Sequence, residues 1–256
     1  MAGDLVAVTG ATGQLGGRVA RLLAARDVPQ RLVVRDPSRA PDLPSIEVAR
    51  ATYDEAETLR DAFTGARTVF LVSAAEHPDR VRQHLTAVDA AVDAGVERVV
   101  YTSFLGAAPD ATFVLARHHH ATEEHIRASG LRHTFLRDSM YLDFVPFMAG
   151  QGVIAGPAGG GRISPVARDD VAEVAVEVLV GDGHNGQTYD VTGARLQTSA
   201  QLAEELSEIV GRDIAYVDET LEQAWESRRP FGAPDWEVEG WVKLSRGGGG
   251  RDGGGE

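Results

Sequence analysis

The chain has 256 residues, of which 43% are hydrophobic and 25% charged, and its formal net charge is −13. This composition is that of an ordinary globular protein, and the negative charge argues against nucleic acid or anionic membranes as general partners, because both require clustered positive charge. The absence of cysteine excludes disulfides, thiolate catalysis and cysteine-based zinc sites. Since no apolar run approaches the ~20 residues of a membrane span and no signal peptide precedes the first predicted strand, we expect a cytoplasmic protein.

The first predicted strand leads through a glycine-rich turn into a helix. Residues 5–9 form a short apolar run with β-branched residues, and apolar residues recur at helical spacing over 15–23. Between them, Gly10, Gly13 and Gly16 are spaced Gly-x-x-Gly-x-x-Gly. Such a turn lets phosphates approach the backbone, and the start of the helix attracts their charge. An ordinary strand-to-helix loop is the alternative, but this context favours nucleotide binding.

A second strand is predicted at 30–35, and it ends at Arg35 with Arg39 close behind. In a βαβ nucleotide site the end of this strand lies beside the adenosine ribose, where an acid binds the 2′-hydroxyl and arginine suits a 2′-phosphate. The sequence therefore predicts NADP(H) in preference to NAD(H). Two alternatives stay open: Arg35 is a solvated residue at a strand end, or Asp36 pairs with it or binds the ribose itself.

Strands and helices then alternate regularly. Strands are predicted at 46–49, 68–73, 98–103 and 133–137, and helices at 54–63 with Asp54 as its cap, at 78–94 and at 113–129. This alternation predicts an α/β fold, a doubly wound parallel sheet with helices on both faces. Ligands bind at the carboxyl ends of such strands. The residues expected to be neighbours there are the loop 10–16, Arg35, Ser73, Ala74, Thr102 and Ser103.

The pattern changes beyond residue 137. An aromatic segment at 141–148 precedes a glycine-rich stretch at 150–161, which we expect to be a loop or hairpin rather than a core element. Further helices are predicted at 168–180 and 198–210, and strands at 187–192 and 214–217. We expect a nucleotide-binding domain at 1–137, a smaller substrate-side lobe at 138–246, from which strand 187–192 could rejoin the main sheet, and a disordered tail at 247–256.

Several motifs resemble a known family. The run 8–16 followed by 34–37 resembles the atypical short-chain dehydrogenase/reductases, specifically the NmrA-like group. Within that group the chain is similar to the type-2 NAD(P)H:quinone oxidoreductases, over 115–124, 126–137, 161–164, 168–175 and 186–193. The resemblance covers most of residues 1 to about 215. Two segments depart from it: Asp138-Ser139-Met140 stands where these reductases tend to have Asn-Gly-Trp, and the glycine-rich end after Lys243 is unlike their helical finish.

The resemblance implies a Rossmann-like domain with a smaller C-terminal substrate lobe, and NADPH-dependent reduction of a quinone or quinone-like carbonyl. It places the cofactor diphosphate at the turn of Gly10, Thr12, Gly13, Gln14, Leu15 and Gly16. It places the 2′-phosphate at Arg35, matches Ser73 to the loop past the fourth strand, and places the strand end at Thr102 and Ser103 beside the nicotinamide. His119 matches a histidine that precedes the pair Thr122-Glu123 in the family motif.

The usual acid/base pair of short-chain dehydrogenases, Tyr-x-x-x-Lys, is absent, because Lys243 is the only lysine and Glu239 stands four residues before it. A quinone tolerates this loss, since it accepts hydride readily and its reduced oxygen is stabilised as a phenolate. We expect His119 to supply a hydrogen bond or proton to that oxygen, with Tyr141 as the second candidate. The alternative is that the histidine run 118–120 forms a solvated helix face.

Other functions stay open from the sequence. One is a redox-sensing regulator of NmrA type that binds NADP(H) without turnover, and another is a ketone reductase of secondary metabolism, suggested by Asp138-Ser139-Met140. No metal site is expected, because the histidines lack helical ligand spacing. The three tryptophans are expected in lobe packing or an oligomer contact, such as a homodimer.

Overall fold

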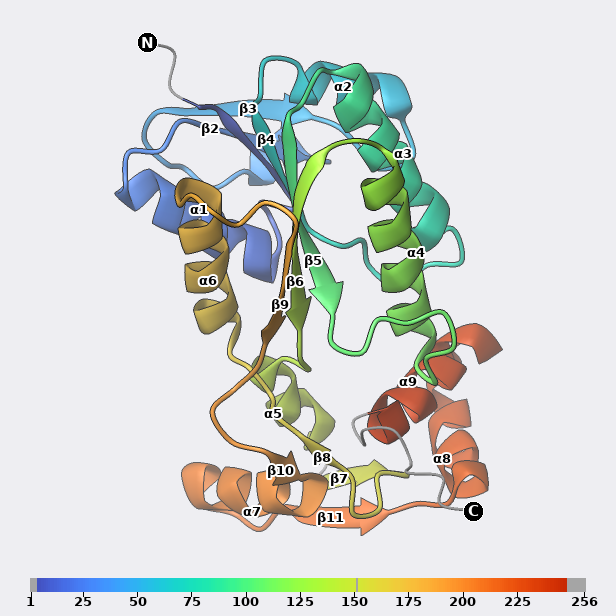
Figure 1. The fold of residues 1–256 in the computed structure, drawn as a ribbon. Coiled ribbons are helices and arrows are strands. Elements are labelled where there is room, and N and C mark those ends of the chain that lie inside the picture. The colour runs from blue at the N-terminus through green and yellow to red at the C-terminus, as the bar shows by residue number, and fades with distance from the viewer. Residues whose placement is uncertain (1–3, 151, 248–256) are drawn as a thin grey trace.

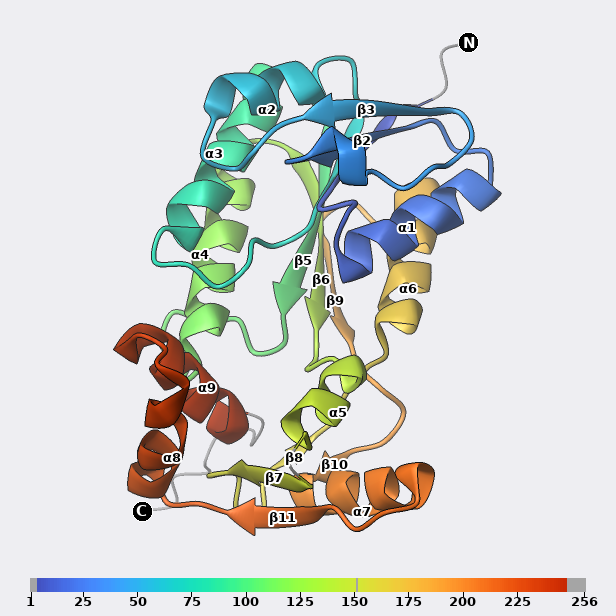
Figure 2. The ribbon, with the colours of Figure 1, turned by 180° about the vertical axis from the view of Figure 1, so that it is seen from behind.

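The computed structural model describes residues 4–150 and 152–247, which form a parallel sheet between two layers of helices, with a smaller lobe at one end (Figures 1 and 2). Beyond Gly247, the tail predicted to be disordered lies outside the described residues. Within them, no helix is both long enough and apolar enough to cross a membrane. The predicted α/β fold with a doubly wound parallel sheet is confirmed.

The main sheet of the described residues has seven strands in the order β3-β2-β1-β4-β5-β6-β9, and every neighbouring pair is parallel. The strands are β1 (Val6–Thr9), β2 (Gln30–Val34), β3 (Ile46–Arg50), β4 (Thr68–Leu71), β5 (Arg98–Phe104), β6 (Arg132–Asp138) and β9 (Gln187–Val191). The strand order reverses between β1 and β4, and ligands of such sheets bind outside the carboxyl ends of the strands at that point.

Two layers of helices cover the sheet (Figure 1). One face carries α1 (Gln14–Ala25) and α6 (Arg168–Val180), and the other carries α2 (Ala56–Phe63), α3 (Arg80–Asp93) and α4 (Val114–Ala128). The apolar side chains of the strands alternate between these two cores, as a sheet buried on both faces requires. Although α6 and β9 follow residue 137 in the sequence, both belong to these layers.

The cap predicted for α2 is wrong. The residue at the N-cap is Glu55, without a side-chain capping bond. Asp54 instead accepts hydrogen bonds from Arg82 at 2.9 Å and Gln83 at 3.2 Å. A capping preference is local and weak, and here contact with the start of α3 has overridden it.

The smaller lobe is assembled from short elements around Ile154, Leu202 and Ile214. They are η2 (Leu142–Phe144), α5 (Val145–Met148), β7 (Val153–Gly156), β8 (Arg162–Ile163), β10 (Gln197–Thr198), α7 (Ser199–Val210) and β11 (Ala215–Asp218). The prediction that 150–161 contains no core element is wrong, because β7 pairs in parallel with β11 and buries Ile154. The run is too short to show its strand character until that distant partner is in place.

Two C-terminal helices were not predicted. These are α8 (Leu221–Arg228), which leads through η3 (Arg229–Phe231) into α9 (Asp235–Gly247). They pack on each other through Ala224, Val238 and Val242, and α9 also contacts α4. Figure 2 shows both helices at the lobe end of the molecule, beside the lower end of α4.

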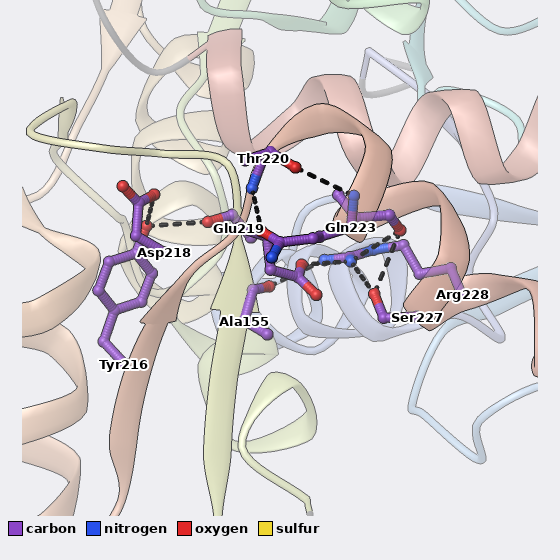
Figure 3. A network of polar contacts seen from close by, with 10 residues as sticks. Ala155, Tyr216, Asp218, Glu219, Thr220, Gln223, Ser227 and Arg228 are labelled. Atoms are coloured by element: carbon purple, nitrogen blue, oxygen red, sulfur yellow. Dashed lines mark hydrogen bonds and ion pairs between the residues drawn. The ribbon is translucent and has the colours of Figure 1, made fainter.

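Arg228 fastens α8 to the lobe, as Figure 3 shows. Its guanidinium donates to the Glu219 carboxylate at 2.6 Å and to the Ala155 carbonyl of β7 at 2.8 Å. Thr220 and Gln223 form a capping box that starts the helix beside this pair. The side chains of Arg228 and Glu219 are only 14% and 9% exposed, so the two charges depend on each other.

We predict that Arg228→Met destabilises the protein by about 3 kcal/mol, because removing one partner leaves Glu219 with an uncompensated, largely buried charge. Urea denaturation followed by circular dichroism measures the change. The matched control is Arg195→Met, whose pair with Glu205 is 70% and 35% exposed and should cost less than about 1 kcal/mol. Equal losses for the two variants would contradict the prediction.

Candidate dinucleotide site

The glycine turn lies between the end of β1 and the start of α1. Gly10 has φ +62°, a left-handed conformation that favours glycine, and its carbonyl accepts the N–H of Gly13 at 2.8 Å. An added Cβ on Gly16 would lie 2.5 Å from the Gly10 carbonyl oxygen, so α1 packs directly against the turn. Within the described residues, α1 has no side-chain cap and no acid in its first turn. Its first N–H groups are therefore suited to an anionic ligand.

The remaining predicted turn residues have different surroundings. Leu15 is buried in the core, so only its backbone can contact a ligand, while Thr12 is half-buried. The exposed Gln14 accepts a hydrogen bond from Arg18 through its side-chain oxygen, at 3.0 Å. Arg18 also pairs with Asp169 at 2.6 Å, which fixes the start of α1 to the start of α6.

Arg35 follows β2 directly and is exposed. The neighbouring Asp36 caps the short helix η1 (Pro37–Arg39), since its Oδ1 atom accepts from the backbone N–H of Ser38 at 3.0 Å and from its hydroxyl at 2.7 Å. These two bonds lower the pKa of Asp36. The Asp36 carboxylate is therefore used within its own turn, and no ion pair joins Arg35 to an acid in the described part of the chain.

The loop after β4 is held by its backbone. The N–H of Ser73 donates to the hydroxyl of Thr102 at 2.9 Å. The N–H of Ala74 donates to His84 Nε2, and the Ala74 carbonyl accepts from Arg80 Nε, both at 2.8 Å. The loop that leaves the sheet at the crevice is thus fixed from β5 and from α3.

His119 supports this arrangement from α4. Its Nε2 atom lies 2.9 Å from Arg80 Nη2, and its Nδ1 atom lies 2.8 Å from the Tyr101 hydroxyl. Because a guanidinium only donates, Nε2 is the acceptor and Nδ1 carries the proton. Burial, with the charge of Arg80 adding to it, lowers the pKa of His119 well below its usual value. Its role as a donor to substrate stays a prediction, and that role requires the neutral ring to exchange one of these bonds.

The adjacent Glu123 connects α4 to the ends of β5 and β6. This fully buried carboxylate accepts from Ser103 at 2.6 Å and from Arg137 at 2.7 and 2.9 Å. Burial alone would raise the pKa of Glu123, but these bonds lower it. The side chain of Ser103 is therefore engaged with the protein, and the geometry assigns it to support of the strand end.

Tyr141 lies just beyond β6 and is half-buried. Its hydroxyl donates to Asp138 Oδ2 at 2.8 Å, and the guanidinium of Arg168 lies 4.5 Å from the centre of its ring. Burial raises the pKa of Asp138 to about 8. Tyr141, just beyond β6, and His119, in α4, thus belong to separate hydrogen-bond networks.

Three residues of the site, Tyr53, Arg80 and His84, were not predicted from the sequence. The hydroxyl of Tyr53 lies 2.6 Å from both Thr9 Oγ1 and the Val72 carbonyl, and so links β1 to β4. A signal existed for Arg80 and His84, which are four residues apart and therefore share one helix face. Together with the glycine turn, these contacts define a protein that binds a dinucleotide at the carboxyl edge of a parallel sheet.

Comparison with known proteins agrees with this class. A family model described as NAD(P)H-binding matches residues 10–181. The NAD(P)H azoreductase of Xenophilus azovorans is 33% identical over 90% of this chain and 82% of its own length, and quinone oxidoreductase 2 of Escherichia coli is 34% identical over 90% and 83%. The chain therefore belongs to the NAD(P)H-binding family, is similar to the type-2 quinone oxidoreductases, and shares the fold of NmrA.

A solved structure extends the likeness. The NADPH-dependent quinone oxidoreductase of Escherichia coli, crystallised with NADPH, has a TM-score of 0.86 at 32% identity, covering 95% of this chain and 88% of that one. The predicted family and the predicted class of enzyme are confirmed: the chain is an NAD(P)H-dependent oxidoreductase.

We predict that Gly16→Ala disrupts the turn, because its Cβ would overlap the Gly10 carbonyl. The free energy of unfolding should fall by about 1–3 kcal/mol, the usual cost of overpacking, and NADPH should bind at least about tenfold more weakly. Calorimetry and urea denaturation measure the two effects. The control is Gly160→Ala, whose Cβ would have no atom within 4 Å. A Gly16→Ala protein that binds NADPH as the control does would show that the close approach is dispensable.

Proposed function

We propose that the protein transfers a hydride from NADPH to a quinone or a quinone-like carbonyl compound. The observation that carries this proposal is the uncapped start of α1 behind the glycine turn, with Arg35 at the end of the neighbouring strand. The relatives named quinone oxidoreductase and azoreductase support the same substrate class, since both names describe reduction of a conjugated acceptor.

The cofactor fits the residues present. When bound, NADPH supplies the hydride. The backbone of the turn 10–16 would hold its diphosphate. Gly16 makes this possible, because a side chain at this position would overlap the turn and keep the start of α1 away from it. Arg35 would hold the 2′-phosphate through charge-assisted hydrogen bonds. The fixed loop at Ser73 and Ala74 would border the nicotinamide, together with the strand end at Thr102.

The proton comes from a group other than a lysine-activated tyrosine. Lys243 lies in α9 and pairs there with Glu239, one turn away. We propose Tyr141 as the group that donates a hydrogen bond to the substrate oxygen, with His119 as the alternative. A quinone suits this arrangement because its oxygen is stabilised on reduction without a strong acid.

The other expectations complete the proposal. The net charge of −13 supports a small molecule rather than a nucleic acid as the partner. The cysteine-free sequence is compatible with the reducing cytoplasm. A homodimer stays a prediction of the sequence analysis.

The purified protein mixed with NADPH and a panel of quinones tests the function. We expect NADPH to be oxidised, as followed by its absorbance, because the hydride acceptor needs little acid assistance. Tight NADPH binding without oxidation across the panel would favour a redox-sensing regulator instead. Turnover of a bulkier ketone without turnover of simple quinones would favour a reductase of secondary metabolism, in line with Asp138-Ser139-Met140.

We predict that Arg35→Ala weakens NADPH binding by about 10- to 100-fold while NADH binding changes little, because a charge-assisted hydrogen bond contributes ~1.5–3 kcal/mol. Calorimetric titration with each nucleotide measures both affinities. Arg39→Ala serves as the neighbouring control and should have the smaller effect. Equal losses for NADPH and NADH would remove Arg35 from the 2′-phosphate position.

A further inference from the structure

Asp138 is a buried acid whose side chain has a single hydrogen-bond partner among the described residues. It is the last residue of β6, between Phe104 of β5 and Val191 of β9, and is only 2% exposed. Its Oδ2 atom accepts from the Tyr141 hydroxyl at 2.8 Å, and its Oδ1 atom has no hydrogen-bond partner among the described residues. A buried acid held this way favours its neutral form, because no cation compensates its charge.

The charged groups described around Asp138 and Tyr141 form no ion pair with the Asp138 carboxylate. Arg168 of α6 lies over the Tyr141 ring, but its guanidinium is also 3.6 Å from the carboxylate of Asp143 in η2. Arg18 of α1 is likewise directed to Asp143, at 3.4 Å. On the β5 side, the titratable group that interacts with Asp138 is Tyr101, which is neutral at ordinary pH because burial raises its pKa further. Arg168 and Arg18 are therefore both directed to Asp143.

Both groups of the pair keep their protons at neutral pH. Burial raises the pKa of Asp138 to about 8, although the bond from Tyr141 lowers it in part. Burial also raises the pKa of Tyr141 well above its usual value, and the neighbouring Asp138 raises it further. The acid therefore changes its charge within a pH range in which the phenol stays neutral.

We propose that the protonation state of Asp138 sets the direction of its hydrogen bond to Tyr141, and so decides whether Tyr141 can donate to the substrate oxygen. This rests on the proposed function of the site. A carboxylate only accepts, so ionised Asp138 keeps the phenolic proton of Tyr141 turned toward itself. A carboxylic acid can donate its own proton to the phenol oxygen, which leaves the phenolic O–H free for the substrate.

The proton balance of the reduction follows from this chain of bonds. The substrate gains the hydride and its electron pair, and negative charge develops on its oxygen. Tyr141 gives its proton to that oxygen and regains one from water, while the neutral Asp138 keeps its own proton and donates a hydrogen bond to Tyr141. One hydride and one proton are consumed for each quinone reduced to hydroquinone.

The pH dependence follows from the acid at position 138. An asparagine amide in its place would donate to the tyrosine at every pH. With Asp138, donation by Tyr141 is expected below the pKa of the acid and is lost as the pH rises through about 8. Asp138 acts here as a positioning residue, since its effect passes through Tyr141.

The test is the pH dependence of kcat between pH 6 and about 9.5 for the wild type, Asp138→Asn and Tyr141→Phe. The wild type should lose about tenfold in kcat for each pH unit above the pKa, as titration of a single group requires. Asp138→Asn should remove the alkaline loss, so that its kcat differs by less than about twofold between pH 6 and about 9.5, because its amide donates a hydrogen bond to Tyr141 at every pH. Tyr141→Phe should have a low kcat throughout, with unchanged affinity for NADPH.

Asp190→Asn, at an exposed position of β9, is the matched control and should keep the wild-type profile. An Asp138→Asn enzyme that retains the alkaline loss would overturn the proposal. So would one that is folded and binds NADPH but is inactive at every pH.

Infrared difference spectroscopy separates this inference from the proposed function. A protonated carboxyl band that titrates near pH 8 and is missing in Asp138→Asn is expected whether or not a quinone is reduced. The band without turnover would reject the proposed function and leave the protonation of Asp138 standing. Turnover without the band would reject the inference alone.

Discussion

The structure depends on the close approach of α1 to the turn after β1. A single Cβ at Gly16 would lie 2.5 Å from the Gly10 carbonyl oxygen, so the helix can reach this position only because a glycine is there. The approach places the uncapped N–H groups of α1 at the carboxyl edge of the sheet, where they can bind an anion. Arg18 then ties the start of α1 to Asp169 of α6, so the anion-binding end of the helix is braced by a second helix on the same face.

A buried polar network holds the loop after β4 at the same edge of the sheet. Arg80 and His84 bind the backbone of Ala74 from α3, and His119 binds Arg80 from α4. Buried polar groups of this kind favour a single geometry, because leaving one of them without a hydrogen bond costs more free energy than forming the bond contributes. Through Arg80, the histidine motif of α4 therefore helps to position the loop after β4 that carries Ser73 and Ala74.

Two buried carboxyl groups at the strand ends have opposite environments. Bonds from Arg137 and Ser103 lower the pKa of Glu123 despite its burial, whereas Asp138 pairs with no cation among the described residues and burial raises its pKa to about 8. One acid therefore stays charged as a structural link between α4 and β6, and the other stays neutral beside Tyr141. When the pKa values of two acids are shifted in opposite directions, one acid can support the structure while the other exchanges a proton.

The sequence by itself determined the alternation of strands and helices, the glycine turn and the position of Arg35, because backbone sterics and hydrophobic periodicity are local properties. Helix ends and the strands of the lobe are harder to predict from the sequence, because they depend on distant contacts. For example, β7 becomes a strand only when β11, some 60 residues later, pairs with it. Only the tertiary structure decided that His119 points into a buried network and that Asp138 meets Tyr141 without a cation, since burial and charge at one residue depend on every element packed around it.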